Sequence, residues 1–121
     1  MSKSGIILIV ITILIMFGGA YLFSKPTEIP TLSGYEYFWG NGCPHCEIVD
    51  EFYQTWEGKD KISVKKLEVW SNTKNAELMA ERAKNCEIPR TGMGVPLLVT
   101  PEGKCLIGSQ PIIDHYKQLE L

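Results

Sequence analysis

Residues 35–46 read YEYFWGNGCPHC and place a run of aromatic residues directly before a C-x-x-C motif, Cys43-Pro44-His45-Cys46. Aromatic residues favour β-strands, so residues 35–39 predict a strand. Proline suits the first turn of a helix, because the N–H that it lacks would have no partner there. The stretch therefore predicts a strand, a short loop and a helix that begins at the motif, with Cys43 exposed at the helix start and Cys46 one turn further in.

This placement favours redox chemistry. The unpaired backbone N–H groups and the positive dipole end of a helix N-terminus lower the pKa of a thiol there, so Cys43 is the expected nucleophile. Cys46 is then placed to attack the mixed disulfide that Cys43 forms. The motif therefore predicts thiol–disulfide exchange, and we expect no cofactor.

The same motif also occurs in zinc sites, haem sites and structural disulfides. A zinc site needs two further ligands, usually as a second close pair, whereas Cys86 and Cys105 are far apart and His115 has no partner at ligand spacing. A c-type haem site needs a histidine directly after the second cysteine, where this chain has Glu47. A purely structural disulfide within the motif stays as an alternative, although such tight pairs more often do redox work.

Residues 6–23 form an uncharged, apolar run. As a helix the run would rise about 27 Å, just enough to cross a bilayer core. A cleaved signal peptide is the alternative, because residues 18–20 resemble a cleavage site, but the run is longer than a usual signal core and continues past that site. We expect residues 1–23 to be a cytoplasmic tail and an uncleaved membrane anchor, with the N-terminus in the cytoplasm.

The rest of the chain divides into a linker and one domain. Residues 24–32 contain two prolines and predict an extended linker. Residues 33–121 suffice for one compact domain, and the formal charge of −2 gives no sign of nucleic-acid binding. The expected orientation places all four cysteines outside the cytoplasm, where disulfides persist.

Apolar periodicity sets the expected order of elements in this domain. Strands are predicted at 35–39, 62–70, 95–100 and 104–107, and helices at 44–57, from about 73 to 86, and after Gly108-Ser109. Pro101 and Gly103 indicate a tight type I turn between the last two strands. The first two strands should pair in parallel and the last two antiparallel.

The motif and the order of elements resemble those of the thioredoxin superfamily. Residues 37–46, followed by Val95-Pro96 ahead of a strand and a hairpin, carry the resemblance, which covers residues 33–121. The element order is most similar to the minimal glutaredoxin-like branch and implies an α/β domain of three layers. The Cys-Pro-His-Cys sequence resembles the motif of DsbA-type oxidases. This resemblance implies that His45 stabilises the Cys43 thiolate and so favours oxidation of the substrate.

The resemblance also implies roles for single residues. Cys43 matches the nucleophile and Cys46 the resolving thiol. Pro96 matches a cis-proline beside the active site, which lets the backbone of Val95 pair with an extended substrate segment. Trp39 resembles the aromatic residue that packs beneath the active-site loop.

The chain also departs from the family pattern. Tyr37 stands where many thioredoxins carry a buried acid, so a proton relay for Cys46 needs another group. Glu36 and Glu68 are candidates, with ordinary solvent-facing acids as the alternative. The lysine that glutaredoxins often place before the motif is absent, and Gly108-Ser109 only partly matches their glutathione-binding turn.

We therefore expect a membrane-tethered, extracytoplasmic thiol–disulfide oxidoreductase that acts on protein substrates. Its redox partner would be a quinone-linked oxidase or a transmembrane reductant. Within this class a reductase for cytochrome maturation or disulfide repair is the main alternative to an oxidase. A redox-inactive module that binds peptides around Val95-Pro96 is the alternative from another class.

Cys86 and Cys105 are expected to form a structural disulfide remote from the motif. In the predicted topology the second helix ends at the sheet edge opposite the motif, and Cys105 follows the hairpin turn at that same edge. Two separate buried thiols are the alternative.

Overall fold

The computed structural model describes the backbone of residues 2–23 and 32–121, and the side chains of residues 2–19 and 32–121. The N-terminal helix α1 spans Lys3–Phe23. Among the described residues, no helix combines the length and the apolar character needed to cross a membrane. The membrane-anchor prediction for residues 6–23 finds no support in this result.

The predicted linker, residues 24–32, lies outside the described residues except for its last residue. The backbone N–H of Leu32 donates to the carbonyl of Pro101 at 2.9 Å, and the Leu32 side chain packs on the domain core. Leu32 is therefore part of the folded domain.

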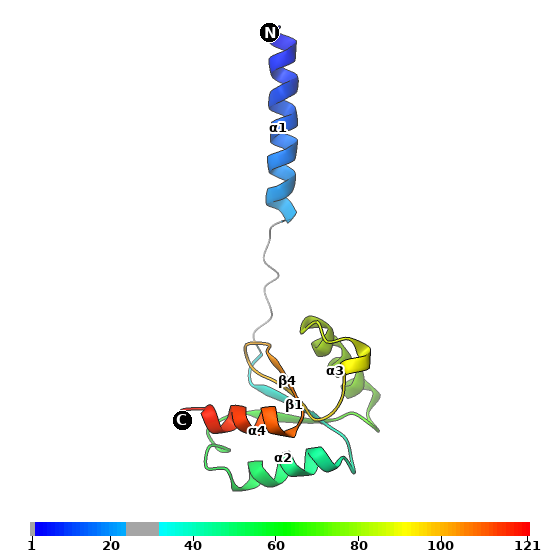
Figure 1. Cartoon of the computed structure of the whole chain (residues 1–121), viewed down its shortest axis with the longest axis vertical. Coiled ribbons are helices and arrows are strands. Elements are labelled where there is room, and N and C mark those ends of the chain that lie inside the picture. The colour runs from blue at the N-terminus through cyan, green and yellow to red at the C-terminus, as the bar shows by residue number, and fades with distance from the viewer. Residues whose placement is uncertain (1, 24–31) are drawn as a thin grey trace.

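The domain is a mixed four-stranded sheet with helices on both faces (Figure 1). In chain order its elements are β1 (Tyr35–Trp39), α2 (Pro44–Thr55), β2 (Val64–Glu68), α3 (Thr73–Asn85), a 3-10 turn (Arg90–Gly92), β3 (Leu97–Val99), β4 (Cys105–Ile107) and α4 (Ser109–Gln118). The strand order is β2-β1-β3-β4. The parallel pairing of β1 with β2 and the antiparallel pairing of β3 with β4 confirm the predicted directions.

The two faces of the sheet bury separate apolar clusters, because side chains alternate along a strand. Tyr35 and Tyr37 of β1 point toward α2 and α4, where they pack with Val49 and Tyr116. Phe38 points to the other face, where the cluster contains Met79 of α3. Figure 1 shows α3 on the side of the sheet away from α2 and α4. This three-layer arrangement is thioredoxin-like.

The central strand β1 brings the C-x-x-C motif to one end of the sheet. After Trp39 the chain turns through residues 40–42, where the N–H of Cys43 donates to the carbonyl of Gly40 at 3.1 Å. Gly42 has a φ of +80°, a conformation that residues with a Cβ rarely adopt. The turn sets the start of α2 directly beyond the end of β1.

At the opposite end, Cys86 and Cys105 form a disulfide with their Cα atoms 6.2 Å apart. Cys86 is the residue that caps the C-terminus of α3, and Cys105 is the first residue of β4. The bond therefore ties the helix on one face to the edge strand of the sheet.

One nearly buried ion pair fastens α3 to the central strand. Arg82 donates from Nε and Nη2 to the carboxylate of Glu36 at 2.7 and 3.1 Å, and the two side chains are only 16% and 13% exposed. Removing one partner would leave a charge with little access to water. We expect Arg82→Met to lower the free energy of unfolding by about 2 kcal/mol in urea titrations.

The control for this prediction is Glu81→Gln, because Glu81 lies 3.6 Å from Arg82 but is 64% exposed. Exposed pairs contribute little, so this variant should match the wild type. Equal stability of Arg82→Met and the wild type would show that the buried pair is dispensable.

Candidate active site

The C-x-x-C motif forms the first turn of α2. Cys43 is the N-cap residue and Pro44 the first helical residue. The N–H of Cys46 lies 3.2 Å from the Cys43 sulfur, and the N–H groups of Cys46 and Glu47 also lie 3.1 Å from the Cys43 carbonyl. Because the Cys46 N–H at this helix start has no carbonyl four residues earlier to bond, its contact with the sulfur can stabilise a thiolate on Cys43.

Cys43 and Cys46 are joined in a disulfide with a Cα–Cα distance of 5.2 Å. Cys43 is only 4% exposed and Cys46 3%, which corrects the expectation that Cys43 is an exposed sulfur. The reason is that the bond turns the two sulfurs toward each other at the end of the sheet. His45, between them, is exposed.

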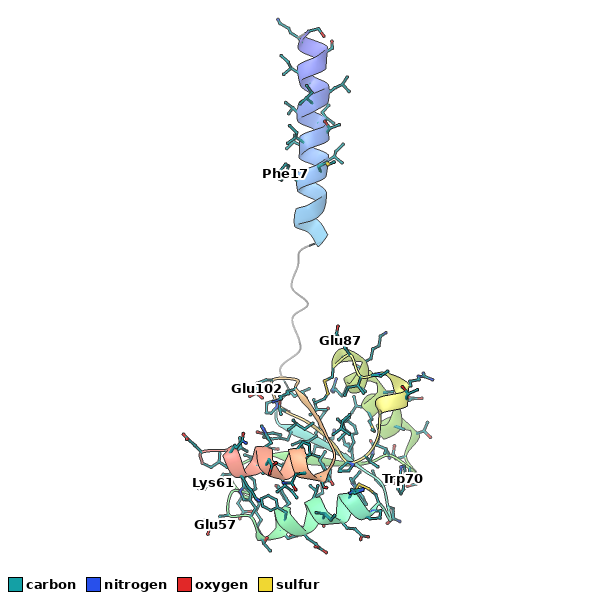
Figure 2. All side chains as sticks on the ribbon, in the orientation of Figure 1. Phe17, Glu57, Lys61, Trp70, Glu87 and Glu102 are labelled. Carbon is teal, nitrogen blue, oxygen red and sulfur yellow. A yellow bond between two sulfur atoms is a disulfide. The ribbon has the colours of Figure 1, made fainter. Side chains whose placement is uncertain are left out.

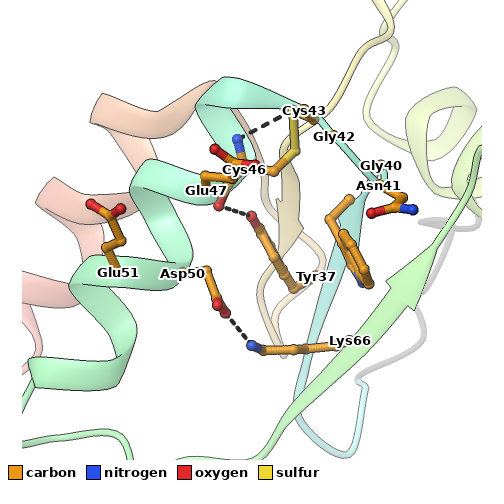
Figure 3. Close-up of a pocket in the computed structure, with 11 residues that line it drawn as sticks. Tyr37, Gly40, Asn41, Gly42, Cys43, Cys46, Glu47, Asp50, Glu51 and Lys66 are labelled. Carbon is orange, nitrogen blue, oxygen red and sulfur yellow. Dashed lines mark hydrogen bonds and ion pairs between the residues drawn. A yellow bond between two sulfur atoms is a disulfide. The ribbon is translucent and has the colours of Figure 1, made fainter.

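Both cysteines line a pocket of about 310 Å³ (Figure 3). Residues from three elements and the loop before α2 complete its wall: Tyr37, Trp39, Gly40, Asn41, Gly42, Glu47, Asp50, Glu51 and Lys66. Trp39 thus lies beside the cysteines and also packs on the core. Both cysteines therefore border the same cavity.

Tyr37 stands between the motif and the floor of the pocket (Figure 3). Its hydroxyl donates to the carbonyl of Cys46 at 3.3 Å. Burial and, to a smaller extent, the negative charge of Asp50 raise the pKa of Tyr37 well above its usual value. Tyr37 therefore stays protonated near neutral pH and acts as a hydrogen-bond donor, not as a base.

Val95 and Pro96 directly precede β3 and are not among the residues that line the pocket. The peptide bond between them is cis. In the antiparallel pairing of β1 with β3, Phe38 faces Leu97, so one further step of the register sets Pro96 beside Trp39. Pro96 is buried and its carbonyl accepts from the N–H of Gly108 at 2.9 Å, whereas Val95 is half-buried. Their predicted role in holding a substrate backbone stays a prediction.

Neither acid predicted as a relay for Cys46 lies among the residues that line the pocket. Glu36 is held by Arg82 on the other face of the sheet. Glu68 instead fastens the active-site loop: its carboxylate accepts from the N–H groups of Asn41, Trp70 and Ser71 at 3.0–3.3 Å and from the Ser71 hydroxyl at 2.6 Å. These bonds lower the pKa of Glu68 to about 2, with the Ser71 hydroxyl as the largest cause.

The Glu68 contacts predict that the stability of the active-site loop depends on pH. Because the pKa is lowered in the folded state, the stabilisation is complete above about pH 4.5 and is lost as the pH falls toward 2. The amide proton of Asn41 should therefore shift with a midpoint near pH 2 in NMR spectra, and Glu68→Gln should remove that transition. An Asn41 signal that titrates equally in both proteins would contradict the assignment.

Trp70 is an exposed aromatic side chain beside the site that the sequence did not single out. It is 60% exposed and packs against Gly40, where an added Cβ would overlap the indole ring. Figure 2 shows Trp70 at the end of the domain where α2 begins. The sequence analysis also missed Asp50 and Lys66. Their signals are the four-residue spacing between Cys46 and Asp50 and the two adjacent lysines of β2, Lys65 and Lys66.

His45 is predicted to set the redox balance of the motif. A group that stabilises the Cys43 thiolate stabilises the reduced domain, so its loss should favour the disulfide. We expect His45→Tyr to move the equilibrium with glutathione toward the oxidised domain by about tenfold, which is about 30 mV. His45→Lys, which can also donate a hydrogen bond to the thiolate, serves as the control and should stay near the wild type. An unchanged equilibrium of His45→Tyr with glutathione would show that His45 does not affect the redox balance.

Comparison of the chain with models of protein families, with curated proteins and with solved structures gave no match. The fold and the geometry of the motif therefore carry the functional argument: a thioredoxin-like α/β domain with a C-x-x-C disulfide at the start of α2 suits thiol–disulfide exchange.

Proposed function

We propose that this domain is a thiol–disulfide oxidoreductase that exchanges disulfides with protein substrates through Cys43 and Cys46. The observation that carries the proposal is the position of the pair: Cys43 caps α2 with its sulfur next to the N–H of Cys46, and both cysteines line one pocket. A thiolate at this position gains stabilisation that a cysteine in a structural disulfide does not need.

The reaction proceeds in two exchanges. In the reducing direction the Cys43 thiolate attacks a substrate disulfide, forms a mixed disulfide and releases one substrate thiolate. Cys46 then loses its proton and attacks the Cys43 sulfur, which forms the Cys43–Cys46 disulfide and releases the second substrate thiolate. The same steps in reverse transfer the disulfide to a reduced substrate, so direction depends on the reduction potential relative to the partner.

We also propose that the domain works in an oxidising compartment. Structural disulfides persist in oxidising compartments, and the bond between Cys86 and Cys105 supports such a compartment for this domain. A separate redox partner would then restore Cys43 and Cys46 after each turnover. Alkylation of cysteines in rapidly quenched cells, followed by peptide mapping, tests this: a largely reduced Cys86 and Cys105 would contradict it.

The function itself is tested by two turnover assays, reduction of insulin by dithiothreitol and oxidation of a reduced peptide by oxidised glutathione. We expect the wild type to accelerate at least one of them and Cys43→Ser to fall to the uncatalysed rate. A double variant, Cys86→Ala with Cys105→Ala, is the matched control and should keep the activity where it stays folded. Equal rates for the wild type and Cys43→Ser would overturn the proposal and favour a redox-inactive binding module.

A further inference from the structure

An Asn-Gly pair, Asn41 and Gly42, lies in the loop that carries Cys43 (Figure 3). Both residues are exposed, and both line the pocket beside Cys43. The backbone N–H of Asn41 donates to Glu68, but the hydrogen bonds of the described residues involve neither the Asn41 side-chain amide nor the N–H of Gly42. A Cβ built on Gly42 would meet no atom within 4 Å. The Asn41 amide can therefore reach the Gly42 nitrogen without displacing a neighbour.

The other three asparagines of the chain are held by hydrogen bonds. The Asn72 side chain caps α3 and accepts from the N–H of Asn75 at 3.1 Å, and the Asn75 side chain donates to the carbonyl of Glu68 at 2.9 Å. Asn85 is the last residue of α3, and the N–H of the residue after it is bonded to the last turn of that helix at 3.1 Å. Asn41 is therefore the one asparagine in the described part of the chain whose side-chain amide and following N–H are both unbonded.

Asparagine is a chemically labile residue, and a following glycine exposes it to attack, because glycine has no side chain to shield its backbone nitrogen. The Gly42 nitrogen forms a bond to the side-chain carbonyl carbon of Asn41 and closes a five-membered succinimide ring. The bond from that carbon to the side-chain nitrogen breaks, and ammonia leaves with the proton that the Gly42 nitrogen loses. Water then adds to either ring carbonyl and opens the ring, which gives aspartate or isoaspartate at position 41.

We propose that Asn41 is a site of spontaneous deamidation whose product shifts the redox balance of the C-x-x-C motif. The effect on the motif rests on the proposed function, whereas the modification itself does not. The new carboxylate is two residues before Cys43 and borders the same pocket. A negative charge there disfavours the Cys43 thiolate, so it destabilises the reduced domain relative to the disulfide.

The product also disturbs the loop itself. The Glu68 carboxylate accepts from the N–H of residue 41 at 3.3 Å and would meet a like charge on the same residue. Isoaspartate, whose backbone runs through the former side chain, adds one carbon between Gly40 and Gly42. The carbonyl of Gly40 accepts from the N–H of Cys43 at 3.1 Å, so the added carbon falls inside the turn that sets the start of α2.

Incubation of the full chain at mildly alkaline pH, followed by peptide mapping with mass spectrometry, tests the modification. A parallel sample unfolded in urea gives the behaviour of the free chain. We expect the folded protein to lose the amide of Asn41 with time, faster at higher pH because the attacking nitrogen must lose its proton. Asn72, Asn75 and Asn85 should stay intact over the same interval. An Asn41 that persists in the folded protein while it converts in urea, or equal conversion at all four asparagines, would overturn the proposal.

The redox effect is tested with Asn41→Asp, which carries the product charge from the start. We expect its equilibrium with glutathione to lie about threefold further toward the oxidised domain than that of the fresh wild type. Asn85→Asp, which adds the same charge at the end of α3, is the matched control and should equal the wild type. As the wild type ages, its equilibrium should move toward the oxidised domain, whereas Asn41→Ser should keep its starting equilibrium.

The outcomes separate the two claims. Equal equilibria for Asn41→Asp and Asn85→Asp, or an aged wild type that has lost the Asn41 amide and keeps its starting equilibrium, would overturn the effect on the motif. A wild type that does not exchange with glutathione at all would instead remove the proposed function and leave the deamidation of Asn41 standing.

Discussion

Cys46→Ala will accumulate as a covalent mixed disulfide with its substrate through Cys43, while Cys43→Ser will form no such adduct. The first exchange needs only Cys43, whose sulfur lies beside the N–H of residue 46, a backbone group that the substitution retains. The second exchange is intramolecular and loses its nucleophile. Without it, release depends on a thiol from solution, so the adduct should live about 1,000-fold longer.

The measurement is non-reducing electrophoresis with mass spectrometry after incubation with a disulfide-containing protein. The control is Cys105→Ala with Cys86→Ala, which should behave as the wild type because both residues lie at the other end of the sheet. An adduct on Cys46 in the Cys43→Ser variant would reverse the assigned roles. In the reduced wild type, iodoacetamide should likewise label Cys43 before Cys46.

The second large effect concerns stability. Removing the bond between Cys86 and Cys105 should lower the free energy of unfolding by about 3 kcal/mol, because it frees a loop with a sequence separation of 19 residues in the unfolded chain. The folded state also loses the covalent link between the end of α3 and β4. For a domain of this size such a change is a large part of the total stability.

Urea unfolding of Cys86→Ala with Cys105→Ala, compared with the wild type, measures this effect. Cys86→Ser with Cys105→Ser is the second variant, since it separates loss of the bond from loss of the small apolar side chains. A decrease below about 1 kcal/mol in both variants would show that the bond adds little to the fold.

The sequence predicted the central strand and the helix after it well, because both signals are local. The aromatic run gave β1 its observed limits, Tyr35 and Trp39, and Pro44 marked the first residue of α2. The later strands are shorter than predicted. Residues 62–70 were predicted from apolar alternation, but β2 ends at Glu68, since Trp70 turns out of the sheet to cover Gly40.

The parts of the site that the sequence did not predict depend on contacts between distant residues. Lys66 meets Asp50 only because β2 lies parallel to β1 beneath the start of α2. Glu36 and Glu68 were candidates for the proton relay on residue type alone. Their partners, Arg82 for one and Asn41 for the other, come from elements that only the folded chain brings near.

The equilibrium of the domain with glutathione tests the central claim most directly. The protein is incubated over a series of reduced-to-oxidised glutathione ratios and quenched with acid, and each cysteine is mapped after alkylation. We predict that Cys43 and Cys46 change together and reversibly at ratios where Cys86 and Cys105 stay bonded. A Cys43–Cys46 disulfide that resists reduction as long as the Cys86–Cys105 bond does would contradict the account and make both bonds structural.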